Sequence, residues 1–181
     1  MKLDIIYPAY DTDPTYREAE AWAKTFFQGV QDQEDADFNS QAIYDLAREK
    51  YTRLINAREI LEKKAAGVVV FVMTATTVLA STVAQGSLLN ISLAFIGIAV
   101  LSSLMVLFPS DWPSSLSIRD ALETCEYNQQ KQCAQLSASL HCSIIGARLI
   151  VNAKSHWMAC GYVAAIIGTM ILVFLRIYYP H

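Results

Sequence analysis

An uncharged segment from Ala65 to Ser110 constrains this chain more than any other feature of its sequence. It contains no Asp, Glu, Lys, Arg or His. A helix needs roughly 20 apolar residues to cross a bilayer core of about 30 Å. Two such stretches follow one another here, "AAGVVVFVMTATTVLASTVA" and "SLLNISLAFIGIAVLSSLMVLF", with "QG" between them. The segment therefore predicts a transmembrane helical hairpin over residues 65–108.

A third apolar stretch, "WMACGYVAAIIGTMILVFL", begins at Trp157. Apolar residues make up 54% of the chain and charged residues 17%, whereas charged residues are about a quarter of a typical soluble domain. A surface helix of a soluble protein would also show a polar face, and none of the three stretches does. The sequence predicts an all-α membrane protein with three transmembrane helices.

The remaining sequence predicts cytoplasmic helices. Pro14 favours the first position of a helix that begins at Asp13. Residues 1–38 then form an N-terminal cytoplasmic segment with this one helix and an acidic linker, and residues 39–64 form an amphipathic helix that continues without a break into the first span. Residues 109–156 supply a long cytoplasmic helix, 157–176 the third span and 177–181 an external tail. The two cytoplasmic helices are expected to pair as a stalk.

Basic residues near the ends of the spans predict the orientation, because they favour the cytoplasmic side. Of the 14 Lys and Arg residues, 9 precede Ala65, and only Arg176 follows the third span. The N-terminus should therefore be cytoplasmic and the C-terminus external, in the inner (cytoplasmic) membrane of a bacterium. Basic and aromatic side chains are expected to anchor the helices at the two interfaces: Lys63, Lys64, Trp112, Trp157, Arg176, Tyr178 and Tyr179.

No catalytic or ligand-binding motif is present in the sequence. There is no glycine-rich phosphate loop, no G-x-S-x-G, no H-E-x-x-H and no C-x-x-C pair among the four cysteines. The net charge of −3 disfavours nucleic acid as a partner, since phosphate contacts need an excess of clustered Lys and Arg. We expect no enzyme activity, no cofactor and no metal site.

Small and hydroxyl residues recur at helical spacing in the apolar stretches. Such residues allow helices to approach closely in a membrane. They serve either packing within the chain or self-association, with hydroxyl groups at a shared interface or pore. The candidates for helix packing or a pore lining are Gly67, Thr74, Thr77, Ser81, Asn90, Ser92, Gly161, Ala165 and Thr169.

The layout resembles that of small membrane effectors of bacterial anti-phage signalling systems, namely the Pycsar transmembrane effector and SLATT-type proteins. The resemblance rests on "INAREILEKKAAGVVVFV", the tight hairpin, "FPSDWP", a long helix and a final span, and covers roughly Gln41 to Leu175. It implies a homo-oligomer that impairs the inner membrane when a nucleotide signal or a partner protein acts on its cytoplasmic helices.

Two other functions stay open on the sequence. The chain could be a non-catalytic membrane anchor or accessory subunit, with the stalk as the docking surface for a soluble cytoplasmic protein. It could also be a transporter or channel, although three spans without an internal repeat or a broken helix disfavour transport.

Overall fold

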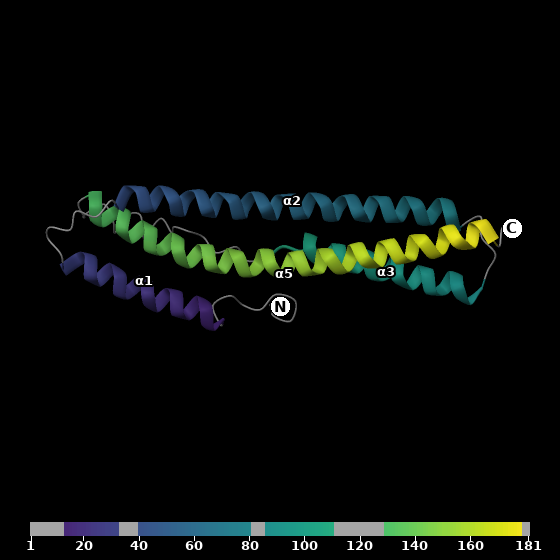
Figure 1. Cartoon of the computed structure of the whole chain (residues 1–181), viewed down its shortest axis with the longest axis horizontal. Coiled ribbons are helices and arrows are strands. Elements are labelled where there is room, and N and C mark those ends of the chain that lie inside the picture. The colour runs from purple at the N-terminus through teal and green to yellow at the C-terminus, as the bar shows by residue number, and fades with distance from the viewer. Residues whose placement is uncertain (1–12, 33–39, 81–85, 111–128, 179–181) are drawn as a thin grey trace. The chain divides into compact units, whose positions relative to one another are not determined.

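A computed structural model describes residues 13–32, 40–80, 86–110 and 129–178 of the chain. These residues form four helices and no strand: α1 (Pro14–Asp32), α2 (Ser40–Ala80), α3 (Ser87–Leu107) and α5 (Gln129–Tyr178). The all-helical prediction is confirmed for this part of the chain (Figure 1). The predicted acidic linker, the break after the second span, and the ends of the chain lie outside the described residues.

The chain divides into two compact units. Unit 1 comprises Met1–Ala57 and Ser110–Val151, and unit 2 comprises Arg58–Pro109 and Asn152–His181. Both α2 and α5 contribute to each unit, because each is one continuous helix through its boundary.

Local chemistry explains where the helices begin and end. The Asp13 carboxylate accepts a hydrogen bond from the Thr15 N–H at 2.8 Å, which caps α1 with Pro14 at its first position. No Gly or Pro interrupts α2 between Ser40 and Lys64, and the predicted continuous helix is confirmed to Ala80. At the end of α3, the Phe108 N–H donates to the carbonyl of Leu104 at 2.9 Å.

Unit 1 packs α1 and parts of α2 and α5 around small side chains. Ala19 and Ala23 of α1 are buried, as are Cys133, Ala134 and Ala138 of α5. Trp22 of α1 stacks obliquely on His141 of α5, with ring centroids 4.9 Å apart. Small side chains let helix axes approach closely, and the buried Leu140 and Ile150 of α5 add aliphatic side chains to the described part of this unit.

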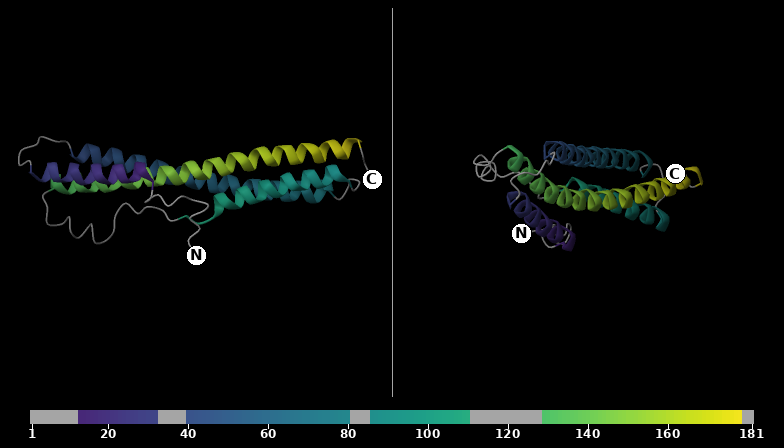
Figure 2. Two further views of the ribbon diagram at one scale, coloured as in Figure 1. Left: turned by 90° about the horizontal axis from the view of Figure 1, so that it is seen from below. Right: turned by 60° about the vertical axis from the view of Figure 1, so that its left-hand side comes forward.

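Unit 2 is a three-helix assembly in which α3 runs antiparallel to the neighbouring parts of α2 and α5 (Figures 1 and 2). Its core draws on all three helices. On α3 the buried positions follow a spacing of alternately four and three residues, which is typical of helices that cross at a small angle. These positions are Ser92, Ile96, Ala99, Ser103 and Val106, and Ser102 beside Ser103 is buried as well.

Two described helices are long and apolar enough to span a membrane, namely α3 and, in α5, the part within Gln132–Tyr178. The described residues therefore contain two such helices and not the three predicted, and α2 is the one that falls short. The described apolar part of α2, Ala65–Ala80, rises only about 24 Å at 1.5 Å per residue, which is short of a bilayer core of about 30 Å. The last residues of the predicted first span, after Ala80, lie outside the described residues.

Candidate functional site: a buried ion-pair cluster

Three charged side chains meet at one end of unit 2. The Lys154 ammonium of α5 donates to the Glu62 carboxylate of α2 at 2.6 Å. The Arg58 guanidinium, one turn earlier on α2, donates to the same oxygen at 2.7 Å. Lys154 also lies 3.4 Å from the carbonyl oxygen of Phe108. The cluster therefore joins α2 and α5 to the residue that ends α3.

The positions of these groups follow from helix geometry. Arg58 and Glu62 are four residues apart and share one face of α2. Phe108 follows the last turn of α3, where unsatisfied carbonyl groups make the negative end of the helix dipole and favour a cation. Lys154 stands seven residues before Gly161 on the packed face of α5, and its side chain is fully buried. A buried ammonium of this kind needs counter-charges, and Glu62 and the carbonyl of Phe108 supply them.

Electrostatics keep Glu62 ionised. Burial raises the pKa of its carboxyl, but the hydrogen bonds from Lys154 and then Arg58 outweigh burial, so the pKa of Glu62 lies below its ordinary value. The cluster thus holds one carboxylate between the side chains of Lys154 and Arg58. This arrangement suits a structural clamp, since breaking a buried pair leaves a charge without a partner. Among the described residues, no group of three or more His, Cys, Asp and Glu side chains could hold a metal ion.

Gly161 and Gly168 of α5 lie close against α3. A Cβ at Gly168 would lie 2.9 Å from Ile96 Cγ1 and 3.2 Å from the Ser92 carbonyl, and one at Gly161 would lie 3.3 Å from Ser103 Oγ. The Ser92 hydroxyl donates to the Gly168 carbonyl at 2.7 Å. Small residues therefore do pack helices here, through α3 and α5.

The candidate residues predicted on α2 do not take part in that packing. Gly67, Thr74 and Thr77 are exposed, and a Cβ at Gly67 would meet nothing within 4 Å. The hydroxyls of Thr74 and Thr77 donate to carbonyls of their own helix, at 2.8 Å to Val70 and 2.9 Å to Met73. Within the described chain these residues make no close contact with another helix, so contact between copies stays a prediction. Ser81 lies outside the described residues.

The other packing candidates divide between the core and the surface. On α3, Asn90 is exposed and Ser92 is buried. On α5, Gly161 and Ala165 are buried, while Thr169 is half-buried. The structure thus brings Ser92, Gly161 and Ala165 into the interior of unit 2 and leaves Asn90 outside it.

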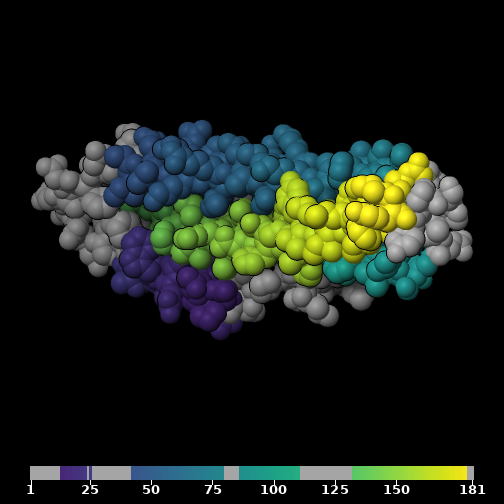
Figure 3. All heavy atoms as spheres, turned by 45° about the vertical axis from the view of Figure 1, so that its right-hand side comes forward, coloured from purple at the N-terminus to yellow at the C-terminus, as the bar shows by residue number. Residues whose placement is uncertain are grey.

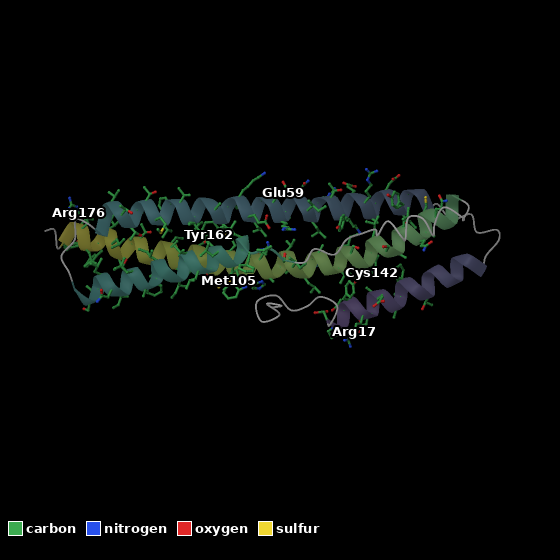
Figure 4. All side chains as sticks on the ribbon, turned by 180° about the vertical axis from the view of Figure 1, so that it is seen from behind. Arg17, Glu59, Met105, Cys142, Tyr162 and Arg176 are labelled. Atoms are coloured by element: carbon green, nitrogen blue, oxygen red, sulfur yellow. The ribbon has the colours of Figure 1, made fainter. Side chains whose placement is uncertain are left out.

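The predicted interface anchors lie at both ends of unit 2. Lys63 and Lys64 are exposed near the end that contains the ion-pair cluster, and Trp157 packs partly buried against the core. Arg176 and Tyr178 are exposed near the other end (Figure 4, where Glu59 and Arg176 mark the two ends). Trp112 and Tyr179 lie outside the described residues.

Sequence reasoning did not single out Glu62, Lys154 and Gly168. One signal was available: Lys154, Gly161 and Gly168 recur every seven residues, a spacing that places them on one face of a helix packed at a small angle. Since two of the three are glycines, that face predicts close packing. A lysine on the same face would then predict a buried cation and a carboxylate opposite it.

Over the residues that the structure describes, these features define an all-helical arrangement in which two helices meet the length and composition of a membrane span. No family model, no curated protein and no solved structure matches the chain. Its function must therefore be argued from its own residues.

Proposed function

We propose that this chain is a non-enzymatic inner-membrane protein that self-associates and impairs membrane integrity when a cytoplasmic trigger acts on unit 1. The outer surface of unit 2 is the observation that carries the proposal. Large apolar side chains on all three helices point away from the core and are roughly half exposed or more, among them Phe71, Leu101, Ile166, Met170 and Phe174. A surface of this kind is stable in lipid and costly in water.

The apolar end of α2 belongs to the same membrane-embedded part of this proposal. Its last described turns lie at the end of unit 2 that also contains the start of α3 and the end of α5 (Figures 1 and 2). Val70, Phe71 and Val78 on this part of α2 are more than half exposed. The exposed side chains of this part of α2 are as apolar as those of α3 and α5. All three helices would therefore be surrounded by lipid.

Self-association would use the small residues on the outside of α2. Thr74 and Thr77 lie on it about one turn apart, outside the groove that Gly67 lines, and their hydroxyls are satisfied within the helix. Such a surface lets a second helix approach closely without burying an unpaired polar group. The membrane-impairing activity of the assembly is what the resemblance to anti-phage effectors implies.

A trigger on unit 1 would act through α2. This helix passes from Ala57 to Arg58, from one unit into the next, without a break. Kinks in helices arise at Pro, Gly pairs or inserted groups, and no Gly or Pro occurs from Ser40 to Lys64. A partner or a nucleotide signal that prefers one arrangement of unit 1 would shift the population of membrane states by that preference.

The membrane-damage test compares two insertions between Ala57 and Arg58 in cells that overexpress the full chain. The wild type is expected to depolarise the inner membrane and admit an impermeant dye. A Gly-Pro-Gly insertion should break α2 and abolish the damage, while the protein still inserts. An Ala-Ala-Ala insertion of the same length keeps the helix and turns it by about 300°, within about 60° of its original face, and should keep most of the damage. Equal damage by both variants would contradict coupling through α2.

A membrane anchor for a soluble partner is the second candidate function. Unit 1 exposes large apolar side chains, Trp22 at 50% and Leu46 at 52%, and aromatic and aliphatic groups of this kind are common in docking surfaces. The membrane-damage test also distinguishes the two functions. If the chain is only an anchor, overexpression of the wild type causes no depolarisation and no dye uptake.

The proposed topology places the N-terminus in the cytoplasm and the C-terminus outside, and it requires a third crossing by the apolar stretch that begins at Ala65, in addition to α3 and α5. Lys63 and Lys64 precede the apolar end of α2, whereas Arg176 is the only basic residue after the third apolar stretch, and basic residues favour the cytoplasmic side. Alkaline phosphatase should be active when fused to the C-terminus and inactive at the N-terminus. A fluorescent protein that matures only in the cytoplasm should give the opposite pattern. Phosphatase activity at the N-terminus would refute this orientation.

A further inference from the structure

An apolar groove runs between α2 and α5 within unit 2. It has a volume of about 640 Å³ and is lined by Lys64, Gly67, Val68, Phe71, Tyr162, Ala165, Ile166, Thr169 and Met170. Figure 3 shows α2 and the C-terminal half of α5 side by side on one face of the molecule. Val68 and Ala165 are nearly buried, while Phe71, Ile166 and Met170 are mostly exposed. The absence of a side chain at Gly67 leaves open space beside α2.

One end of the groove is cationic. Nearby, Lys63 pairs with Glu59 at 3.7 Å, and Lys154 and Arg58 pair with Glu62. Lys64 is exposed, and within the described residues it forms no ion pair. Of the basic residues described at this end, Lys64 is the one that lines the groove, so its ammonium can meet a ligand there.

We propose that the groove binds one anionic phospholipid, with an acyl chain between α2 and α5 and the headgroup phosphate on Lys64. The proposal rests on the membrane location given under Proposed function. A cation at one end and apolar side chains along the rest match a molecule with an anionic head and an apolar tail. Basic pockets between membrane helices are a known means of holding anionic headgroups, and the groove volume lies within the usual range for ligand sites.

A second copy of this chain fits the groove less well. From Ala65 to Ser110 the chain has no acidic residue, so the apolar hairpin of another copy offers no counter-charge to Lys64. A parallel copy would bring its own Lys64 to the same level, and like charges at an interface are unfavourable. An anionic headgroup supplies the missing charge.

The test uses the full chain in lipid nanodiscs and measures lipid retention by native mass spectrometry. Phosphatidylglycerol and phosphatidylcholine with identical acyl chains are compared. The wild type should retain the anionic lipid about fivefold better, as expected for one lysine near a charged headgroup. Lys64→Gln should abolish this preference. Lys63→Gln removes the neighbouring lysine, which does not line the groove, and should leave most of the preference intact.

Gly67→Leu tests the acyl chain separately from the headgroup. A Cβ at this position would meet no other group within 4 Å, so the fold should persist, as circular dichroism can verify. The leucine would occupy the groove and should lower retention of both lipids. An unchanged preference in Lys64→Gln, or unchanged retention in Gly67→Leu, would overturn the proposal.

The outcomes separate this inference from the proposed function. A chain that enters nanodiscs but shows no preference for phosphatidylglycerol contradicts the lipid site and leaves the membrane location intact. A chain that fails to enter nanodiscs refutes both. If Gly67→Leu changes crosslinking between copies while lipid retention stays the same, the groove is occupied by a second copy, and the lipid proposal is wrong.

Discussion

Replacing Glu62 with leucine is expected to destabilise unit 2 by about 3 kcal/mol, near the lower end of the range for breaking a buried ion pair because Glu62 is partly exposed. The fully buried Lys154 would keep only the Phe108 carbonyl as a partner. Lys154→Met should cost less, since Glu62 keeps its hydrogen bond from Arg58. Denaturant unfolding of the protein in detergent micelles would measure both changes.

A double variant and an exposed control sharpen this experiment. The pair Glu62→Leu and Lys154→Met replaces the ion pair with apolar side chains and should be more stable than Glu62→Leu alone. Glu59→Leu, one turn earlier on α2, removes an exposed ion pair with Lys63 and should change stability by less than about 1 kcal/mol. Equal losses in the Glu59 and Glu62 variants would contradict a buried cluster.

The ion pair between Glu62 and Lys154 makes the stability of unit 2 depend on pH in a direction that can be predicted. The pKa of Glu62 is lowered in the folded chain, so its contribution to stability is present above the unfolded pKa of about 4.3. That contribution is lost as the pH falls through the depressed folded value. Acidification should therefore destabilise the wild type more than the Glu62→Leu variant.

Substitution of Gly168 by alanine is expected to cause the second large loss of stability. The new Cβ would lie 2.9 Å from Ile96 Cγ1, 3.2 Å from the Ser92 carbonyl and 3.3 Å from the Ile96 amide nitrogen. Two of these atoms belong to the backbone of α3, so the helices must move apart, at a cost of about 1–3 kcal/mol. The movement would also weaken the hydrogen bond from the Ser92 hydroxyl.

Two other glycines provide matched comparisons for Gly168. Gly161→Ala places its Cβ 3.3 Å from Ser103 Oγ and farther from the backbone of α3, so a smaller loss is expected. A Cβ at Gly97 would meet nothing within 4 Å. Gly97→Ala should therefore raise the free energy of unfolding by up to about 1 kcal/mol, because alanine has a higher helix propensity than glycine. Thermal unfolding in detergent micelles would rank the three alanine variants by stability. A Gly168→Ala variant as stable as Gly97→Ala would exclude the close contact between α3 and α5.

Features that depend on nearby residues were predictable from the sequence. The start of α1 follows from Asp13 and Pro14, and the continuity of α2 follows from the absence of Gly and Pro. Features that depend on how one helix lies against another were not. The small residues of α2 predicted close packing, but within the described residues Gly67 lies on the outside, and it is Gly168 of α5 that packs closely against α3. The pairing of Glu62 with Lys154 joins residues 92 positions apart, and it depends on the register between α2 and α5.

That separation in sequence also imposes an order on biosynthesis. The ribosome makes Glu62 and then the whole of α3 before Lys154 exists, so the nascent α2 and α3 must wait for the third helix. Until α5 arrives, Glu62 has only Arg58, the Phe108 carbonyl has no ammonium beside it, and the glycine faces that complete the core are missing. Lys154 therefore completes the ion-pair cluster only after α2 and α3 have been made, and nascent chains that end before it would leave Glu62 without its partner on α5.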